Sequence, residues 1–111
     1  MTDSTDSTVV AVCGSKDCRT RPEYDDLTAA LGGADVPVEV IDSRCLDICK
    51  GPVVVVRRTD DRPIVFRKVR GRKQRRDLVA LVAGGPVTDR LRSIRVTGST
   101  ARRAIARIRP R

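Results

Sequence analysis

The sequence has 111 residues, enough for one compact domain with a modest core and too few for a second domain of ordinary size. It contains four cysteines and no histidine, which excludes catalytic triads with an imidazole base, Rieske-type clusters and Cys2His2 zinc fingers. The net charge of +9 is unevenly distributed: residues 1–86 carry fifteen Lys or Arg and thirteen Asp or Glu, whereas residues 87–111 carry eight Arg and one Asp.

The first half of the chain is predicted to form a strand, a helix and a second strand. Residues 1–7 are polar and acidic and are expected to be disordered. Residues 8–13 form an apolar, β-branched run that is typical of a buried strand. Residues 21–33 predict a helix that begins near a proline and ends at two glycines, and residues 36–42 predict the second strand. A right-handed crossover through this helix should make the two strands parallel neighbours.

Two further strands and a second helix follow. Residues 51–58 and 63–69 are β-rich runs separated by a polar turn, which predicts a hairpin. Residues 72–85 place their apolar positions at helical spacing, so this helix can pack on the sheet. The predicted fold class is therefore α/β, with the order βαββα and a mixed sheet that has helices packed on it. We expect residues 8–86 to form this domain and residues 87–111 to form a basic C-terminal extension.

The extension carries most of the excess positive charge. Near its end, apolar residues recur at helical intervals opposite arginines, which predicts a short amphipathic helix. Such a helix fits a frayed end or a segment that binds an acidic partner. Leu91, Ile94 and Val96 offer a further alternative, in which part of this stretch covers the sheet. The residues predicted to bind the partner are Arg102, Arg103, Arg107 and Arg109.

The only four cysteines form two spaced pairs, each after a predicted strand. The first pair has the pattern C-x4-C and the second has C-x3-C. Parallel neighbouring strands end at the same side of a sheet, so the two loops should face each other and bring four thiols together. Two pairs on facing loops suit a two-iron cluster in which each pair holds one iron. Structural zinc and a redox dithiol remain alternatives, although these sites more usually contain C-x2-C.

The chain resembles the thioredoxin-like [2Fe-2S] ferredoxins over about residues 8–92. The resemblance rests on both cysteine spacings, on the motif KGPVVVV after the last cysteine, and on LVALVAGGPVTDRL near the end of this region. It implies a thioredoxin-like βαββα fold, a [2Fe-2S] cluster, one-electron transfer between redox proteins, and a homodimer. The related small subunits of NADH dehydrogenase and hydrogenases carry a helical region before the first cysteine, so a free-standing ferredoxin fits better. The implied cluster ligands are Cys13, Cys18, Cys45 and Cys49.

Residues beside the cysteines are expected to form the cluster environment. Glycines leave room for backbone N–H groups to point at sulfur, and cations favour the more negative, reduced cluster. Apolar side chains between the ligands shield the sulfurs from water. The predicted glycines are Gly14 and Gly51, the cations are Lys16, Arg19, Arg44 and Lys50, and the apolar residues are Leu46 and Ile48.

The sequence offers no catalytic acid or base and no phosphate-binding loop, so we expect an electron carrier rather than an enzyme. Its predicted partners are acidic redox proteins. The alternative function is a zinc-stabilised basic module that binds nucleic acid or an acidic protein through residues 67–76 and the C-terminal arginines. Tyr24 and Phe66 are the only aromatic residues, which disfavours stacking on single-stranded bases.

The expected location is the cytoplasm. The chain shows neither a signal sequence nor a run of about eighteen apolar residues, so we expect a soluble protein without a membrane span. In that reducing compartment, four thiols are more readily explained as metal ligands or redox groups than as structural disulfides.

Overall fold

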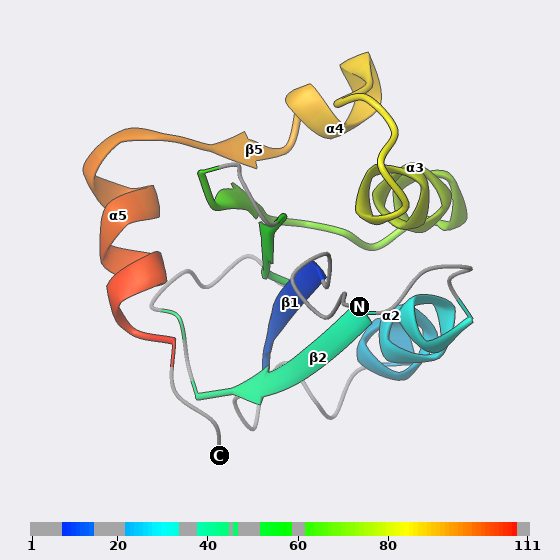
Figure 1. The fold of residues 1–111 in the computed structure, drawn as a ribbon, viewed down its shortest axis with the longest axis horizontal. Helices are drawn as coiled ribbons and strands as arrows, with labels where there is room; N and C mark the ends of the chain where they lie inside the picture. Colours follow the sequence, from blue (N-terminus) through cyan, green and yellow to red (C-terminus); the bar gives the residue numbers. More distant parts are fainter. Residues whose placement is uncertain are drawn as a thin grey trace, which may run out of the picture.

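The computed structural model describes an α/β fold with a five-stranded mixed sheet and four helices in the described residues (Figure 1). These residues are 8–14, 22–33, 38–44, 46, 52–58 and 62–108. The elements in chain order are β1 (Thr8–Cys13), α2 (Pro22–Gly32), β2 (Val38–Ser43), β3 (Val54–Arg57), β4 (Ile64–Phe66), α3 (Arg72–Val82), α4 (Asp89–Arg92), β5 (Arg95–Val96) and α5 (Gly98–Ala106).

The sheet has the strand order β2-β1-β3-β4-β5. β1 and β2 are parallel, as the crossover through α2 predicts, and Cys13 lies opposite Ser43 in the register. β3 is antiparallel to β1, and β4 is antiparallel to β3. β1, β2 and β4 therefore end at the same end of the sheet, where β3 begins. We call this the cysteine end of the sheet, because Cys13 is the last residue of β1.

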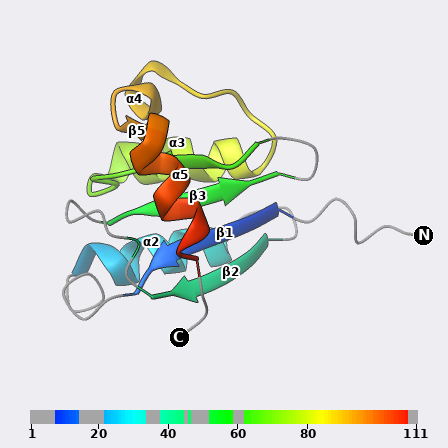
Figure 2. The same ribbon diagram turned by 90° about the vertical axis from the view of Figure 1, so that its left-hand side faces the viewer.

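Helices cover both faces of the sheet, and the two halves of the core follow the alternation of β1. Val10 and Val12 point to the face on which α2 and α3 pack, and they share a core cluster with residues such as Leu27 and Leu78. Cys13 and Ala11 belong to the cluster on the other face, which α5 covers. Figures 1 and 2 show these three layers, with α5 crossing its face of the sheet alone.

The elements predicted for residues 8–82 are confirmed, with small shifts at their ends. The first strand has the predicted bounds, and the helix expected over residues 21–33 spans Pro22–Gly32. The second strand was expected over residues 36–42 and is Val38–Ser43. The hairpin strands are shorter than their apolar runs, because neighbouring strands pair over only three or four residues there. The order βαββα is thus present through α3.

The C-terminal segment from residue 87 to residue 108 is part of the same fold. Leu91 is fully buried and belongs to the cluster under α3, and β5 extends the sheet by pairing Val96 with Val65. Gly98 has φ of +74°, a left-handed conformation that suits glycine where the chain turns from β5 into α5. Ala101 and Ala104 of α5 are buried against the sheet. The segment expected to be an extension therefore adds a strand and two helices, as in the alternative in which it covers the sheet.

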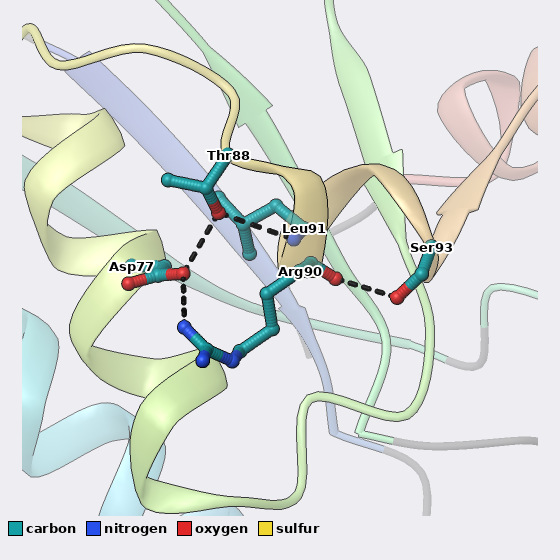
Figure 3. A network of polar contacts seen from close by, with 5 residues as sticks. All are labelled: Asp77, Thr88, Arg90, Leu91 and Ser93. Carbon is teal, nitrogen blue, oxygen red and sulfur yellow. Dashed lines mark hydrogen bonds and ion pairs between the residues drawn. The ribbon is translucent and has the colours of Figure 1, made fainter.

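A small polar cluster joins α3 to α4 (Figure 3). The Thr88 hydroxyl donates a hydrogen bond of 2.7 Å to the Asp77 carboxylate and accepts one of 3.3 Å from the Leu91 N–H. Arg90 forms a 2.9 Å ion pair with the same Asp77 oxygen. Thr88 thus caps α4 through its side chain while it holds Asp77, and this fixes the position of the buried Leu91.

This cluster makes the stability of the fold dependent on pH in the acidic range. The Thr88 hydrogen bond, with a further contribution from Arg90, lowers the pKa of Asp77 against the opposing effect of its partial burial. The carboxylate therefore stabilises the folded state fully above the unfolded pKa of about 3.9, and this contribution is lost as the pH falls through the lower folded pKa. We expect Asp77→Asn to destabilise the protein modestly at neutral pH and to flatten this part of the pH dependence.

Urea unfolding between about pH 2.5 and pH 7 measures both effects. Asp89→Asn is the matched control, since Asp89 also pairs with an arginine, Arg92, but its side chain is 99% exposed. Equal pH dependence in the wild type and in Asp77→Asn would contradict this prediction.

The two edges of the sheet differ in length. β5 is two residues long, whereas β2 is six residues long and exposes Glu39 and Val40.

In the part of the chain that the structure describes, no helix combines the length and apolar character needed to cross a membrane.

Candidate metal centre

Cys13 is a buried residue at the cysteine end of the sheet. It is 1% exposed and lies in the core cluster beneath α5. Its backbone N–H donates a 2.9 Å hydrogen bond to the carbonyl of Val53, the residue that precedes β3. Cys13 is therefore held between the end of β2 and the start of β3.

The chain segment that carries the second cysteine pair is anchored on both sides of Cys13. It leaves β2 at Ser43, the register partner of Cys13, and it returns at Val53. Between these anchors, Leu46 is fully buried in the same core cluster as Cys13. Cys45 directly precedes Leu46 in the sequence. Both ends of the second loop, and Leu46 within it, therefore lie close to Cys13, whereas Cys18, Cys45 and Cys49 lie outside the described residues.

Of the residues predicted to surround the cluster, the structure describes Gly14, Arg44 and Leu46. The N–H of Gly14 donates a 2.7 Å hydrogen bond to the Ser43 carbonyl and so joins the ends of β1 and β2. Leu46 is buried and Arg44 is exposed. Several predicted residues lie outside the described part of the chain: Lys16, Cys18, Arg19, Cys45, Ile48, Cys49, Lys50 and Gly51.

Among the described residues, no group of three or more Cys, Asp or Glu side chains is arranged to hold a metal ion. Cys13 is the one cysteine of the four that these residues include. The ion pairs that Asp77 and Asp89 form with arginines lie in α3 and α4, away from β1. At the cysteine end, Asp42 lies on β2 opposite Val12, and its carboxylate accepts a 2.6 Å hydrogen bond from the Tyr24 hydroxyl.

The arginines predicted to bind a partner lie on α5. Arg102, Arg103 and Arg107 are exposed, whereas Arg109 lies outside the described residues. Arg102 lines a hollow of about 360 Å³ with Arg62 and Arg95, beside Pro63 and Ile64 where β4 begins. Arg102 and Arg103 belong to α5 and Arg107 is its C-cap, and this helix covers the face of the sheet that includes Cys13.

Sequence reasoning missed one relationship near the site. The basic segment at residues 67–76 follows β4, which ends at the cysteine end of the sheet. The N–H of Val69 in this segment donates a 3.2 Å hydrogen bond to the carbonyl of Pro52, the neighbour of Val53. The predicted hairpin indicates this position, because the second strand of a hairpin ends beside the start of the first strand.

Comparisons of this chain with known protein families, with curated proteins and with solved structures found no match.

Proposed function

We propose that this chain is a [2Fe-2S] ferredoxin that carries single electrons between redox proteins. The observation that carries the proposal is the position of Cys13, buried at the end of β1 between Ser43 and Val53, the two anchors of the loop that contains Cys45 and Cys49. A loop with both anchors beside the first cysteine supports convergence of the two cysteine pairs.

Chain length adds a quantitative argument for Cys45. Paired strands lie about 4.8 Å apart, so the Cα of Ser43 is near that of Cys13. Two residues of chain reach at most about 7 Å further, which holds the Cα of Cys45 within roughly 12 Å of that of Cys13. Leu46, the next residue, packs in the cluster of Cys13 and favours a shorter separation.

The strand order also supports the thioredoxin-like fold that the resemblance implies. The order β2-β1-β3-β4, with β1 and β2 parallel and the other pairs antiparallel, agrees with a βαββα unit of that type. α2 and α3 pack on one face of this sheet. We propose that residues 8–82 form such a unit, to which α4, β5 and α5 are added.

The donor set fits an iron–sulfur cluster. Four thiolates with no histidine are the usual ligands of a [2Fe-2S] cluster, which supplies a site that gains and loses one electron. The residues around Cys13 would keep water from its sulfur, since Leu46, Val53 and Cys13 itself are at most 1% exposed. Arg44, exposed at the end of β2, would favour the reduced state through its positive charge.

A reducing compartment suits this chemistry, and we propose a cytoplasmic location with acidic redox proteins as partners. A homodimer remains the oligomeric state that the resemblance implies. The alternative to this proposal is a structural zinc ion held by the same four thiolates.

We expect the anaerobically purified protein to contain two irons and two acid-labile sulfides per chain, and to be reddish-brown. Iron and sulfide analysis, together with a visible absorption spectrum before and after reduction, measures this. Loss of visible absorbance on reduction would accompany uptake of about one electron per chain. Stoichiometric zinc and a colourless protein after expression with ample iron would overturn the proposal.

A further inference from the structure

A basic surface lies at the start of α3, next to the cysteine end of the sheet. Residues 67–76 contain seven cations and no carboxylate. We call this the β4–α3 basic surface. Its exposed cations are Lys68, Arg70, Arg72, Lys73 and Arg76, and Arg75 is partly buried.

The cations of the first turns of α3 form no ion pair in the described structure, although the charge of Arg76 acts on the neighbouring Asp77. The ion pairs there join Asp77 to Arg90 and Asp89 to Arg92. Among the described residues, Arg72, Lys73 and Arg76 have no carboxylate within 4 Å. Their charge is therefore available to an anionic partner.

The local sequence is unfavourable for the helix itself. The N-terminus of a helix carries a partial positive charge and favours acidic residues, but the first turn of α3 contains none. Gly71, at the N-cap, makes no side-chain capping hydrogen bond. Burial of Leu78, Leu81 and Val82 in the core offsets these local costs, so the fold tolerates basic first turns in α3.

The surface is connected to Cys13 through two backbone hydrogen bonds. The Val69 N–H binds the carbonyl of Pro52, and the Cys13 N–H binds the carbonyl of the next residue, Val53. Figure 2 shows the beginning of α3 at the end of the sheet where the β2 arrow ends. The β4–α3 basic surface and Cys13 therefore lie at the same end of the sheet, with Cys13 in the core cluster on the opposite face, which α5 covers.

The surface includes a hollow of about 310 Å³ between α2 and α3. The guanidinium-bearing residues Arg72, Arg75 and Arg76 line it, and Ala30 and Val79 add apolar walls. The Arg75 guanidinium donates a 2.9 Å hydrogen bond to the Arg70 carbonyl, which orients it. Arginines arranged around a hollow can bind carboxylates with two parallel hydrogen bonds, and arginine is frequent among the residues that dominate binding energy at interfaces.

We propose that the β4–α3 basic surface binds an acidic segment of the redox partner protein. This inference rests on the proposed electron-transfer function, which requires a partner to dock close to the cluster. Single-stranded nucleic acid is disfavoured because neither aromatic residue forms an exposed platform: Phe66 is fully buried, and the Tyr24 hydroxyl donates a 2.6 Å hydrogen bond to Asp42.

The test compares two variants that each remove two positive charges. Arg72→Gln/Arg76→Gln changes the β4–α3 basic surface, and Arg102→Gln/Arg103→Gln changes exposed positions of α5, the competing surface that the sequence predicts to bind a partner. The probe is a fluorescently labelled poly-glutamate peptide, and its affinity is measured by anisotropy at low and at physiological ionic strength. A labelled DNA duplex of similar length is titrated in parallel.

We expect the α3 variant to weaken peptide binding about tenfold at low ionic strength, since each exposed pair contributes a factor of about three. The α5 variant should weaken it less than about threefold, and the difference should shrink as salt screens the charges. Equal weakening in both variants would overturn the inference, because it would reflect net charge alone. Tighter binding of the DNA than of the peptide, lost in the α3 variant, would also overturn it in favour of nucleic acid.

Iron content and the visible spectrum of the same three preparations test the proposed function separately. A selective loss of peptide binding in a protein without a cluster would contradict the ferredoxin proposal and leave the docking surface supported. A normal cluster with no selective loss would contradict the docking surface alone.

Discussion

Replacing Cys45 or Cys49 by serine is expected to abolish the wild-type visible spectrum and to reduce the iron content sharply. Serine offers a hard hydroxyl in place of a soft thiolate, and iron–sulfur clusters depend on thiolate ligands. Each of these cysteines lies on the loop whose anchors, Ser43 and Val53, flank the buried Cys13. The loss of either proposed ligand from this loop should therefore also weaken the binding of the cluster through Cys13.

The control is Asp60→Asn, between β3 and β4, at a sequence position remote from all four cysteines. It should keep the spectrum and the iron content of the wild type. Far-UV circular dichroism of each serine variant reports whether the protein still folds when the cluster is lost. An unaltered spectrum in both serine variants would show that the second cysteine pair does not bind the cluster.

Removal of residues 87–111 is expected to destroy the cooperative fold. The deletion takes away Leu91 from the cluster beneath α3, the partner of Val65 in the sheet, and the helix that covers Cys13 on the other face. Truncation of one buried leucine to alanine costs about 2–5 kcal/mol, against a total stability of about 5–15 kcal/mol for an ordinary domain. The summed loss exceeds the free energy of unfolding expected for a domain of this size.

The graded form of this experiment is Leu91→Ala, with the neighbouring Arg92→Ala as control. Leu91 is fully buried, whereas the Arg92 side chain is 67% exposed and pairs only with the exposed Asp89. Urea unfolding should show a loss of about 2–5 kcal/mol for Leu91→Ala and less than about 1 kcal/mol for Arg92→Ala. A chain ending at residue 86 that unfolds cooperatively, with wild-type stability and cluster content, would contradict this prediction.

The first six elements could be predicted because each has a strong local pattern. β1 is apolar from Val9 to Cys13. The α2 sequence has a proline at its start and glycines at its end, and the α3 sequence spaces Leu78, Leu81 and Val82 along one face. The parallel pairing of β1 and β2 then follows from chirality, since a single helix connects them. These features belong to the sequence itself and need no knowledge of distant contacts.

Of the C-terminal elements, α5 was predicted from its apolar residues at helical spacing, whereas α4 and β5 lacked such a pattern. β5 has two residues and α4 has four, which is too short for either hydrophobic period to appear. β5 forms only because β4 offers a free side at Val65 and Phe66, and α4 depends on the contact between Thr88 and Asp77. Such long-range contacts cannot be inferred from composition, and the arginines of this segment made it resemble a charged extension.

The candidate site was predictable in part. The position of Cys13 at the end of a buried strand and the burial of Leu46 agree with the prediction. The commitment of the Gly14 N–H to the Ser43 carbonyl was not foreseen, because it depends on the detailed register of the two strands. A second contact that the sequence does not indicate lies outside the candidate site. The Arg58 guanidinium donates a 3.2 Å hydrogen bond to the carbonyl of Gly85, which follows α3.

The unequal edges of the sheet bear on self-association. Sheet edges expose backbone donors and acceptors to which a second chain can add, and this is a common route to aggregation. A two-residue strand such as β5 offers too few of these groups for stable growth. The longer edge, β2, carries the exposed Glu39 near the hydrophobic Val40, and two copies that paired along it would bring their carboxylates together. The charge on the longer edge and the shortness of the other are two features that disfavour edge-to-edge pairing of the described strands.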